Sequence, residues 1–187
     1  MSTTRNVAVI VGSLRKDSYN RMMAHALAEV APASLKLDIA EIGQLPLYNP
    51  DADTASPPAA WASFRQKVKG ADAVLFVTPE YNRSVPAPLK NAIDVGSRPY
   101  GQSVWDGKPG AVVSVSPGAI GGFGANHHLR QSFVFLNVPV MQQPEAYIGG
   151  AADLFDTSGK LKNEGTREFL RKFVTSFAAW IEKISPR

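Results

Sequence analysis

The sequence predicts a three-layer α/β domain in which five parallel strands alternate with about five helices. Three nearly continuous apolar runs are typical of strands buried on both faces of a parallel sheet: Val7–Val11, Ala73–Val77 and Ala111–Val115. Between these runs, apolar residues recur at helical spacing. The chain has 187 residues, of which 44% are apolar and 19% charged. This composition suits one domain, residues 1–187, with a sizeable core, and excludes a disordered polyelectrolyte.

The first half of the chain alternates between strand and helix patterns. After the first apolar run, a helical stripe extends from Tyr19 to Val30, and Pro32 ends it. Residues 35–39 alternate strictly between apolar and polar, which predicts an edge strand with one wet face. Residues 43–58 are rich in proline, aspartate and alanine and are predicted to form a long loop.

The second half repeats the alternation and supplies the fifth strand. Further helices are predicted around residues 61–68, 86–93, 129–136 and 169–184. Residues 138–141 have a strand-like pattern, and Pro139 within them belongs on a sheet edge. With the second and fifth strands at the edges, the predicted order is 2-1-3-4-5. The other common doubly wound order expects six strands and a different pair outside.

The charge of the chain favours small anionic ligands. The formal net charge is +4 and the sequence pI is about 9.4. The lysines and arginines are scattered, and no run of them could follow a nucleic-acid backbone. We therefore expect no nucleic-acid partner and a surface that attracts nucleotide cofactors or oxyanions.

Cysteine is absent, which excludes disulfides, thiolate metal sites and cysteine nucleophiles. No apolar stretch precedes the first strand, and no window holds about 18 consecutive apolar residues. We expect a cytoplasmic protein that does not contact membranes. His127 and His128 are adjacent on a predicted helix and point to different faces, so we expect no metal site.

Ligands of such sheets bind beyond the carboxyl ends of the strands, where the strand order reverses. In the order 2-1-3-4-5 this point lies between the first and third strands. The rule selects three loops, which follow Val11, Thr78 and Ser116 in the sequence.

The first loop, residues 12–20, carries the donors that a phosphate monoester requires. It offers hydroxyls at Ser13 and Ser18, an amide at Asn20, a guanidinium at Arg15 and the free N–H groups of the coming helix. It lacks the Gly-Lys-Ser/Thr ending of a P-loop and the glycine pattern of a dinucleotide turn. The alternative is that Ser18 only caps the helix.

The second loop, residues 78–86, is expected to make a tight turn that exposes successive backbone amides. Those amides can meet the acceptor-rich edge of an isoalloxazine ring, and Tyr81 could cover part of the ring. The alternative is an ordinary strand-to-helix turn with a surface tyrosine. In the third loop, Gly121, Gly122 and Gly124 lack side chains, which would let a flat ring approach the backbone.

Taken in order, these segments closely resemble the NADPH-dependent FMN reductase family of flavodoxin-like fold. The matching motifs are Gly12-Ser13-Leu14-Arg15 with Ser18 and Asn20, then Pro79-Glu80-Tyr81-Asn82, then Ser116 with its glycines. Residues 129–131 in the fourth helix extend the similarity. The nearest branch is that of the bacterial quinone and chromate reductases.

The resemblance implies an FMN site built from all three loops. It assigns the FMN phosphate to Ser13, Arg15, Ser18 and Asn20. The complete set of implied cofactor-binding residues is Ser13, Leu14, Arg15, Ser18, Tyr19, Asn20, Pro79, Glu80, Tyr81, Asn82, Ser116 and Gly118. No catalytic acid or base is implied, because the cofactor carries the chemistry. Arg98, after the helix that follows the second loop, is a candidate for binding an anionic acceptor or the nicotinamide cofactor; the alternative is a solvated arginine.

The implied activity is an FMN-dependent NAD(P)H oxidoreductase. Hydride would pass from NADPH or NADH through FMN to quinones or other small acceptors, including chromate, in a ping-pong cycle. The branch also implies a homodimer or homotetramer. Two alternatives remain open: a flavodoxin-like electron carrier, and a regulatory protein of the same fold without turnover of its own.

Overall fold

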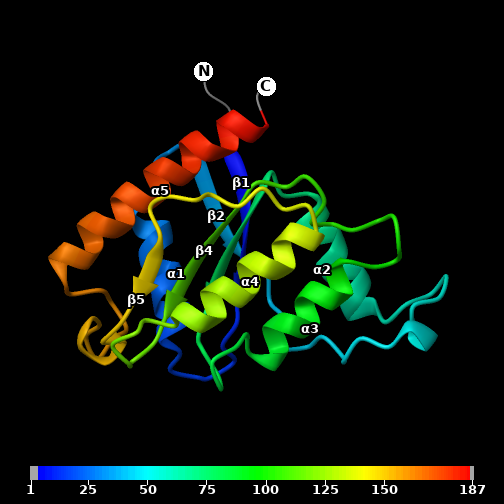
Figure 1. Cartoon of the computed structure of the whole chain (residues 1–187), viewed down its shortest axis with the longest axis horizontal. Coiled ribbons are helices and arrows are strands. Elements are labelled where there is room, and N and C mark those ends of the chain that lie inside the picture. The colour runs from blue at the N-terminus through cyan, green and yellow to red at the C-terminus, as the bar shows by residue number, and fades with distance from the viewer. Residues whose placement is uncertain (1–3, 186–187) are drawn as a thin grey trace.

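The computed structural model describes residues 4–185 and contains a five-stranded parallel sheet with helices on both faces (Figure 1). The strands are β1 (Arg5–Val11), β2 (Leu35–Ile39), β3 (Ala73–Thr78), β4 (Gly110–Val115) and β5 (Ala146–Ile148). Their order is β2-β1-β3-β4-β5, and every neighbouring pair is parallel. The predicted strand order is therefore confirmed.

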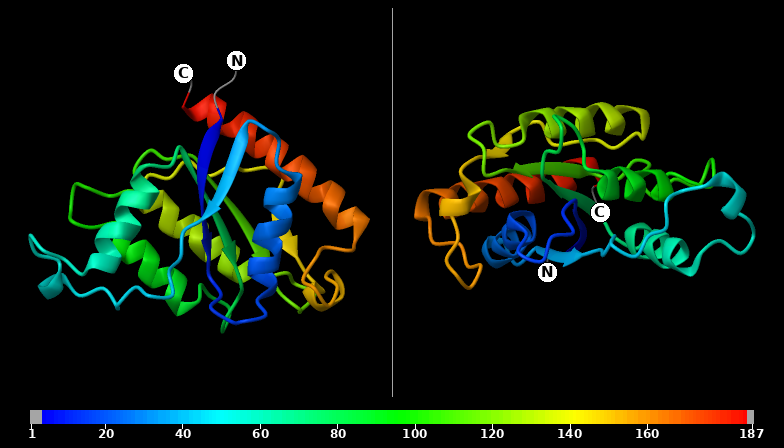
Figure 2. Two further views of the ribbon diagram at one scale, coloured as in Figure 1. Left: turned by 180° about the vertical axis from the view of Figure 1, so that it is seen from behind. Right: turned by 90° about the horizontal axis from the view of Figure 1, so that it is seen from below.

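The helices form two layers, one on each face of the sheet (Figure 2). One face is covered by α1 (Tyr19–Val30) and α5 (Glu164–Ile184), and the other by α2 (Ala59–Lys69), α3 (Ala87–Gly96) and α4 (Phe123–Phe135). Val7 and Val9 of β1 face the first core, while Ala8 and Ile10 face the second, as the strand period of two requires. In the described part of the chain, no helix is long and apolar enough to cross a membrane.

The fifth strand is not where the sequence pattern placed it. Residues 138–141 do lie at the edge of the sheet, but only Val140 forms an isolated bridge, to Gly110. Pro139 has no N–H to donate, so a continuous ladder cannot form there. The chain then returns as β5, which pairs with residues 113–115. A strand of three residues is too short to show a period in the sequence.

The segment predicted as a long loop, residues 43–58, forms hydrogen bonds and an ion pair with side chains of α2 and α3. It contains a short 3-10 helix, η1 (Pro50–Ala52). Asp53 forms a bidentate ion pair with Arg65 of α2, with both distances 2.8 Å. The indole N–H of Trp61 and the amide N–H of Asn91 both donate to the Pro46 carbonyl, at 3.0 Å each. This segment is therefore an ordered cover over α2 and α3.

Candidate functional site

The loops after β1, β3 and β4 meet at the carboxyl ends of these strands, at the lower edge of the view in Figure 1. Together they line a pocket of 220 Å³ that is open to solvent on one side. Its lining residues are Ser13, Arg15, Tyr19, Asn20, Pro79, Glu80, Tyr81, Val115, Ser116 and Pro117. The switch-point rule therefore predicted the position of this pocket correctly.

The first loop presents the positive end of α1 to the pocket. Ser18 is the N-cap of this helix, and its hydroxyl oxygen accepts the N–H of Arg21 at 3.2 Å. The capping role that we considered for Ser18 is therefore real, although its O–H remains a donor. The first turn of α1 contains no acidic residue. The free N–H groups and the helix dipole here favour an anion.

Two side chains beside this helix end have polar groups that are not hydrogen-bonded within the described residues: the Arg15 guanidinium and the Oδ1 of Asn20. Arg15 is exposed, with its guanidinium 6.0 Å from the Tyr19 ring centroid, and no carboxylate of the described residues pairs with it. Asn20 is buried and donates to the Val115 carbonyl at 3.4 Å. Its Oδ1 is the only buried side-chain nitrogen or oxygen within residues 4–185 that lacks a hydrogen bond. Such an orphan atom indicates a ligand that completes the network.

The second loop is a tight two-residue turn. Tyr81 and Ser84 exchange both of their backbone hydrogen bonds, at 3.1 and 3.0 Å. Asn82 and Arg83 at the tip have positive φ angles of 51° and 63°. Both angles are typical of a type I′ turn, which leaves the tip amides outside the ladder. Tyr81 is 46% exposed and lines the pocket.

Glu80 lines the pocket, but its carboxylate is bound to the start of α4. Oε2 accepts the N–H of Ala125 at 3.0 Å, and Oε1 accepts from the Arg83 guanidinium at 2.9 Å. Burial disfavours the charged form of Glu80, but the N–H of Ala125, the Arg83 side chain and the N–H of Gly124 outweigh it and lower the pKa of this carboxyl. Glu80 is therefore ionised at neutral pH.

This lowered pKa predicts a pH-dependent contribution to stability. Because the folded pKa lies below the ordinary value of 4.5, the contribution is complete above about pH 5 and is lost as the pH falls through the folded pKa. Glu80→Gln cannot titrate, so its unfolding midpoint should fall less steeply than that of the parent between about pH 5 and pH 3. Thermal unfolding of both proteins across this range measures the difference; parallel curves would contradict the prediction.

The glycines of the third loop serve close packing inside the protein. A Cβ on Gly121, whose φ is 64°, would lie 2.6 Å from the Tyr147 carbonyl carbon in β5. A Cβ on Gly124 would lie 2.8 Å from the Arg83 carbonyl oxygen. The interpretation that these two glycines make room for a flat ring is thus corrected. Ser116 does line the pocket, and its Oγ accepts the N–H of Gly118 at 3.1 Å.

Several predicted residues lie beside the pocket rather than in its lining: Leu14, Ser18, Asn82 and Gly118. Leu14 is 49% exposed and lies over Gly43. Two lining residues were absent from the prediction, Val115 and Pro117. Both flank Ser116, so the end of the strand and its following proline were the signal that could have identified them.

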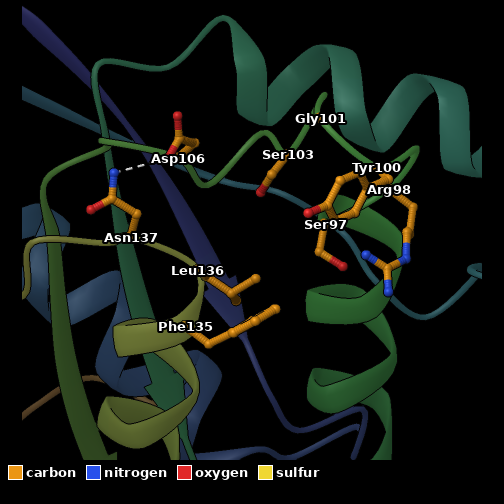
Figure 3. Close-up of a pocket in the computed structure, with 9 residues that line it drawn as sticks. All are labelled: Ser97, Arg98, Tyr100, Gly101, Ser103, Asp106, Phe135, Leu136 and Asn137. Atoms are coloured by element: carbon orange, nitrogen blue, oxygen red, sulfur yellow. Dashed lines mark hydrogen bonds between the residues drawn. The ribbon is translucent and has the colours of Figure 1, made fainter.

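Arg98 is not brought to this pocket. It follows the C-terminal end of α3, whose ten residues separate it from the second loop by about 15 Å. There it lines a different pocket of 390 Å³ (Figure 3). In this view Arg98 and Tyr100 lie on one side, and Asp106, bonded to Asn137 at 2.9 Å, lies on the other.

The two neighbouring histidines contact different partners, as their adjacent helix positions require. The Nε2 of His127 lies 3.0 Å from the Tyr147 hydroxyl, and the Nδ1 of His128 lies 2.9 Å from the Ser84 hydroxyl. Burial, together with Glu145, raises the pKa of Tyr147 to about 12, so this hydroxyl stays protonated at neutral pH.

The fold defines a flavodoxin-like protein, with a pocket where the loops after β1, β3 and β4 meet. The chain belongs to the NADPH-dependent FMN reductase family, which it matches over residues 5–153. It is therefore an oxidoreductase, and the family predicted from the three motifs is confirmed.

Known proteins support this assignment over nearly the whole chain. A quinone reductase of Pseudomonas putida is 69% identical over 182 residues, which are 97% of each chain. A solved flavoenzyme NAD(P)H:(acceptor) oxidoreductase of Paracoccus denitrificans superposes with a TM-score of 0.90 and 43% identity, covering 96% of this chain and 98% of its own. A flavodoxin variant of Pseudomonas aeruginosa shares the fold, with a TM-score of 0.58, 18% identity and coverage of 95% and 99%.

Proposed function

We propose that this chain binds FMN in the three-loop pocket and transfers electrons from NADPH or NADH to quinones. The observation that carries the proposal is the unpartnered polar set at the start of α1, where Arg15 and the buried Oδ1 of Asn20 face one pocket. Free donors at a positive helix end suit a phosphate. An orphan amide beside them suits a polyhydroxylated chain.

The pocket residues fit FMN by their chemistry. Ser13, Arg15, Ser18 and the amides of α1 would hold the phosphate, and Asn20 with Ser116 would face the ribityl chain. The Tyr81–Ser84 turn would offer its tip amides to the ring edge, and Tyr81 would cover part of the ring. When bound, FMN supplies the exchange of hydride and electrons. The protein orients the group, and we assign no acid or base to any side chain.

Quinones are the proposed acceptors because the 69% identical relative is described as a quinone reductase. Chromate is a second proposed acceptor, and the net charge of +4 supports the approach of such an anion. The sequence has no glycine-rich dinucleotide-binding motif that would select NADH over NADPH, so the proposal includes both as hydride donors.

The visible spectrum of the purified protein, loaded with FMN, tests the function directly. We expect a yellow complex that bleaches on anaerobic addition of NADPH or NADH and recovers when a benzoquinone is added. Repeating the recovery step with chromate tests the second acceptor. A complex that forms but is not bleached by either nicotinamide would favour an electron carrier. A protein that takes up no FMN would favour a regulatory role and overturn the proposal.

We further propose that the chain works in the cytoplasm as a homodimer or homotetramer. Because Arg98 lies about 15 Å from the second loop along α3, its proposed contact with substrate needs the pocket of a second copy. Sedimentation of the parent and of Arg98→Ala measures the assembly. A monomeric parent would exclude this role for Arg98.

A further inference from the structure

Glu80 is a largely buried carboxylate between two loops of the site, and the proposed function above gives its side chain no part. The side chain is 9% exposed, and its two oxygens accept from Ala125 and Arg83. A buried charge persists only where it is paired and hydrogen-bonded. These partners therefore explain why the carboxylate lies where it does.

Helix α4 depends on this carboxylate for its cap. Its N-cap residue is Gly122, with a φ of 77°, and this residue makes no side-chain hydrogen bond to the helix. The first turn contains no acidic residue. The first N–H groups of a helix need acceptors from elsewhere. Glu80 supplies the acceptor for the N–H of Ala125 from a different loop, 45 residues earlier in the chain.

The backbone at the start of α4 also lies in tight van der Waals contact with the Tyr81–Ser84 turn. A Cβ on Gly124 would lie 2.8 Å from the Arg83 carbonyl oxygen and 2.9 Å from Oε2 of Glu80. The backbone at the start of α4 is thus pressed against the turn that carries Asn82 and Arg83. The turn is held from outside the pocket by α4: Glu80 bonds to the first turn of the helix, and the Ser84 hydroxyl lies 2.9 Å from the Nδ1 of His128 further along it.

We propose that Glu80 is a positioning residue for the flavin ring. Its bonds to the start of α4 fix the tip of the Tyr81–Ser84 turn, so that the tip amides keep one orientation toward the pocket. The proposal rests on the proposed function, because it assigns these amides to the ring. Glu80 acts at the ring end of the ligand, whereas Arg15 and the start of α1 act at the phosphate end.

Riboflavin, which is FMN without the phosphate, separates the two ends of the ligand. Quenching of flavin fluorescence measures the affinity of each variant for both flavins. We expect Glu80→Ala to weaken FMN and riboflavin by the same factor, about tenfold. Glu80→Gln keeps one acceptor and should lose less. Arg15→Ala should weaken FMN alone, and Glu168→Gln on the exposed face of α5 should change neither affinity.

Hydrogen exchange on the flavin-free protein gives a second readout, independent of binding. We expect residues 80–84 and 123–126 to exchange faster together in Glu80→Ala, with residues 12–20 unchanged. Unchanged affinities in both Glu80 variants, or a loss confined to FMN, would overturn the positioning role. If Glu80→Ala does not fold, Glu80→Gln decides the same comparison. A parent that binds neither flavin would instead overturn the proposed function, and the ring assignment with it.

Discussion

The double variant Arg15→Ala/Ser18→Ala is expected to lose about 100-fold in affinity for FMN. Arg15 is the one guanidinium at the pocket without a carboxylate partner among the described residues, so its donors are free for the phosphate. A hydrogen bond to a charged group contributes about 1.5–3 kcal/mol, and a hydroxyl adds about 1 kcal/mol. Titration of the flavin-free proteins with FMN, followed by flavin fluorescence, measures the loss.

Removal of Ser18 also removes a helix cap, which costs about 1 kcal/mol of stability by itself. The double variant Arg171→Ala/Asn163→Ala on α5 is a matched control. It removes one arginine, and it removes the N-cap whose Oδ1 accepts the N–H of Thr166 at 2.8 Å. We expect this control to lose a similar stability and to keep its affinity for FMN. Equal affinity losses in both double variants would show that the start of α1 holds no phosphate.

The core strands and the pocket loops could be predicted from the sequence because each depends on residues that are neighbours in the chain. A segment buried on both faces, such as residues 7–11 of β1 or 73–77 of β3, must be apolar at every position, so five residues suffice to identify it. The first loop could be placed at the pocket for a similar reason, because its many short donors lie within a few residues directly after β1. These signals are local in the chain.

The features that the sequence did not reveal depend on contacts between distant residues. The role of Glu80 depends on Ala125, 45 residues away, and on a glycine that lets the two segments touch. The position of Arg98 was available in principle, because a helix of ten residues carries it to the far end of α3. The order in residues 43–58 depends on partners that no local pattern shows.

The ion pair that holds this segment predicts the largest effect on stability. The side chains of Arg65 and Asp53 are 11% and 5% exposed, and the Arg65 Nε also donates to the Val95 carbonyl at 2.8 Å. Removing one partner of a buried pair leaves an uncompensated charge, which costs about 3–5 kcal/mol. We expect Arg65→Ala to lower the free energy of unfolding by this amount. Urea unfolding followed by tryptophan fluorescence measures it.

A double-mutant cycle separates the energy of the Arg65–Asp53 ion pair from that of the packing of the aliphatic part of the Arg65 side chain. Arg65→Met alone and Asp53→Ala alone should each be costly, because each leaves one buried charge without its partner, whereas the double variant Arg65→Met/Asp53→Ala should recover much of the loss. FMN affinity should stay unchanged in the double variant, since neither residue lines the three-loop pocket. Single losses below about 1 kcal/mol would mean that the pair behaves as a surface ion pair. In that case residues 43–58 would be held by the bonds of Trp61 and Asn91 to Pro46.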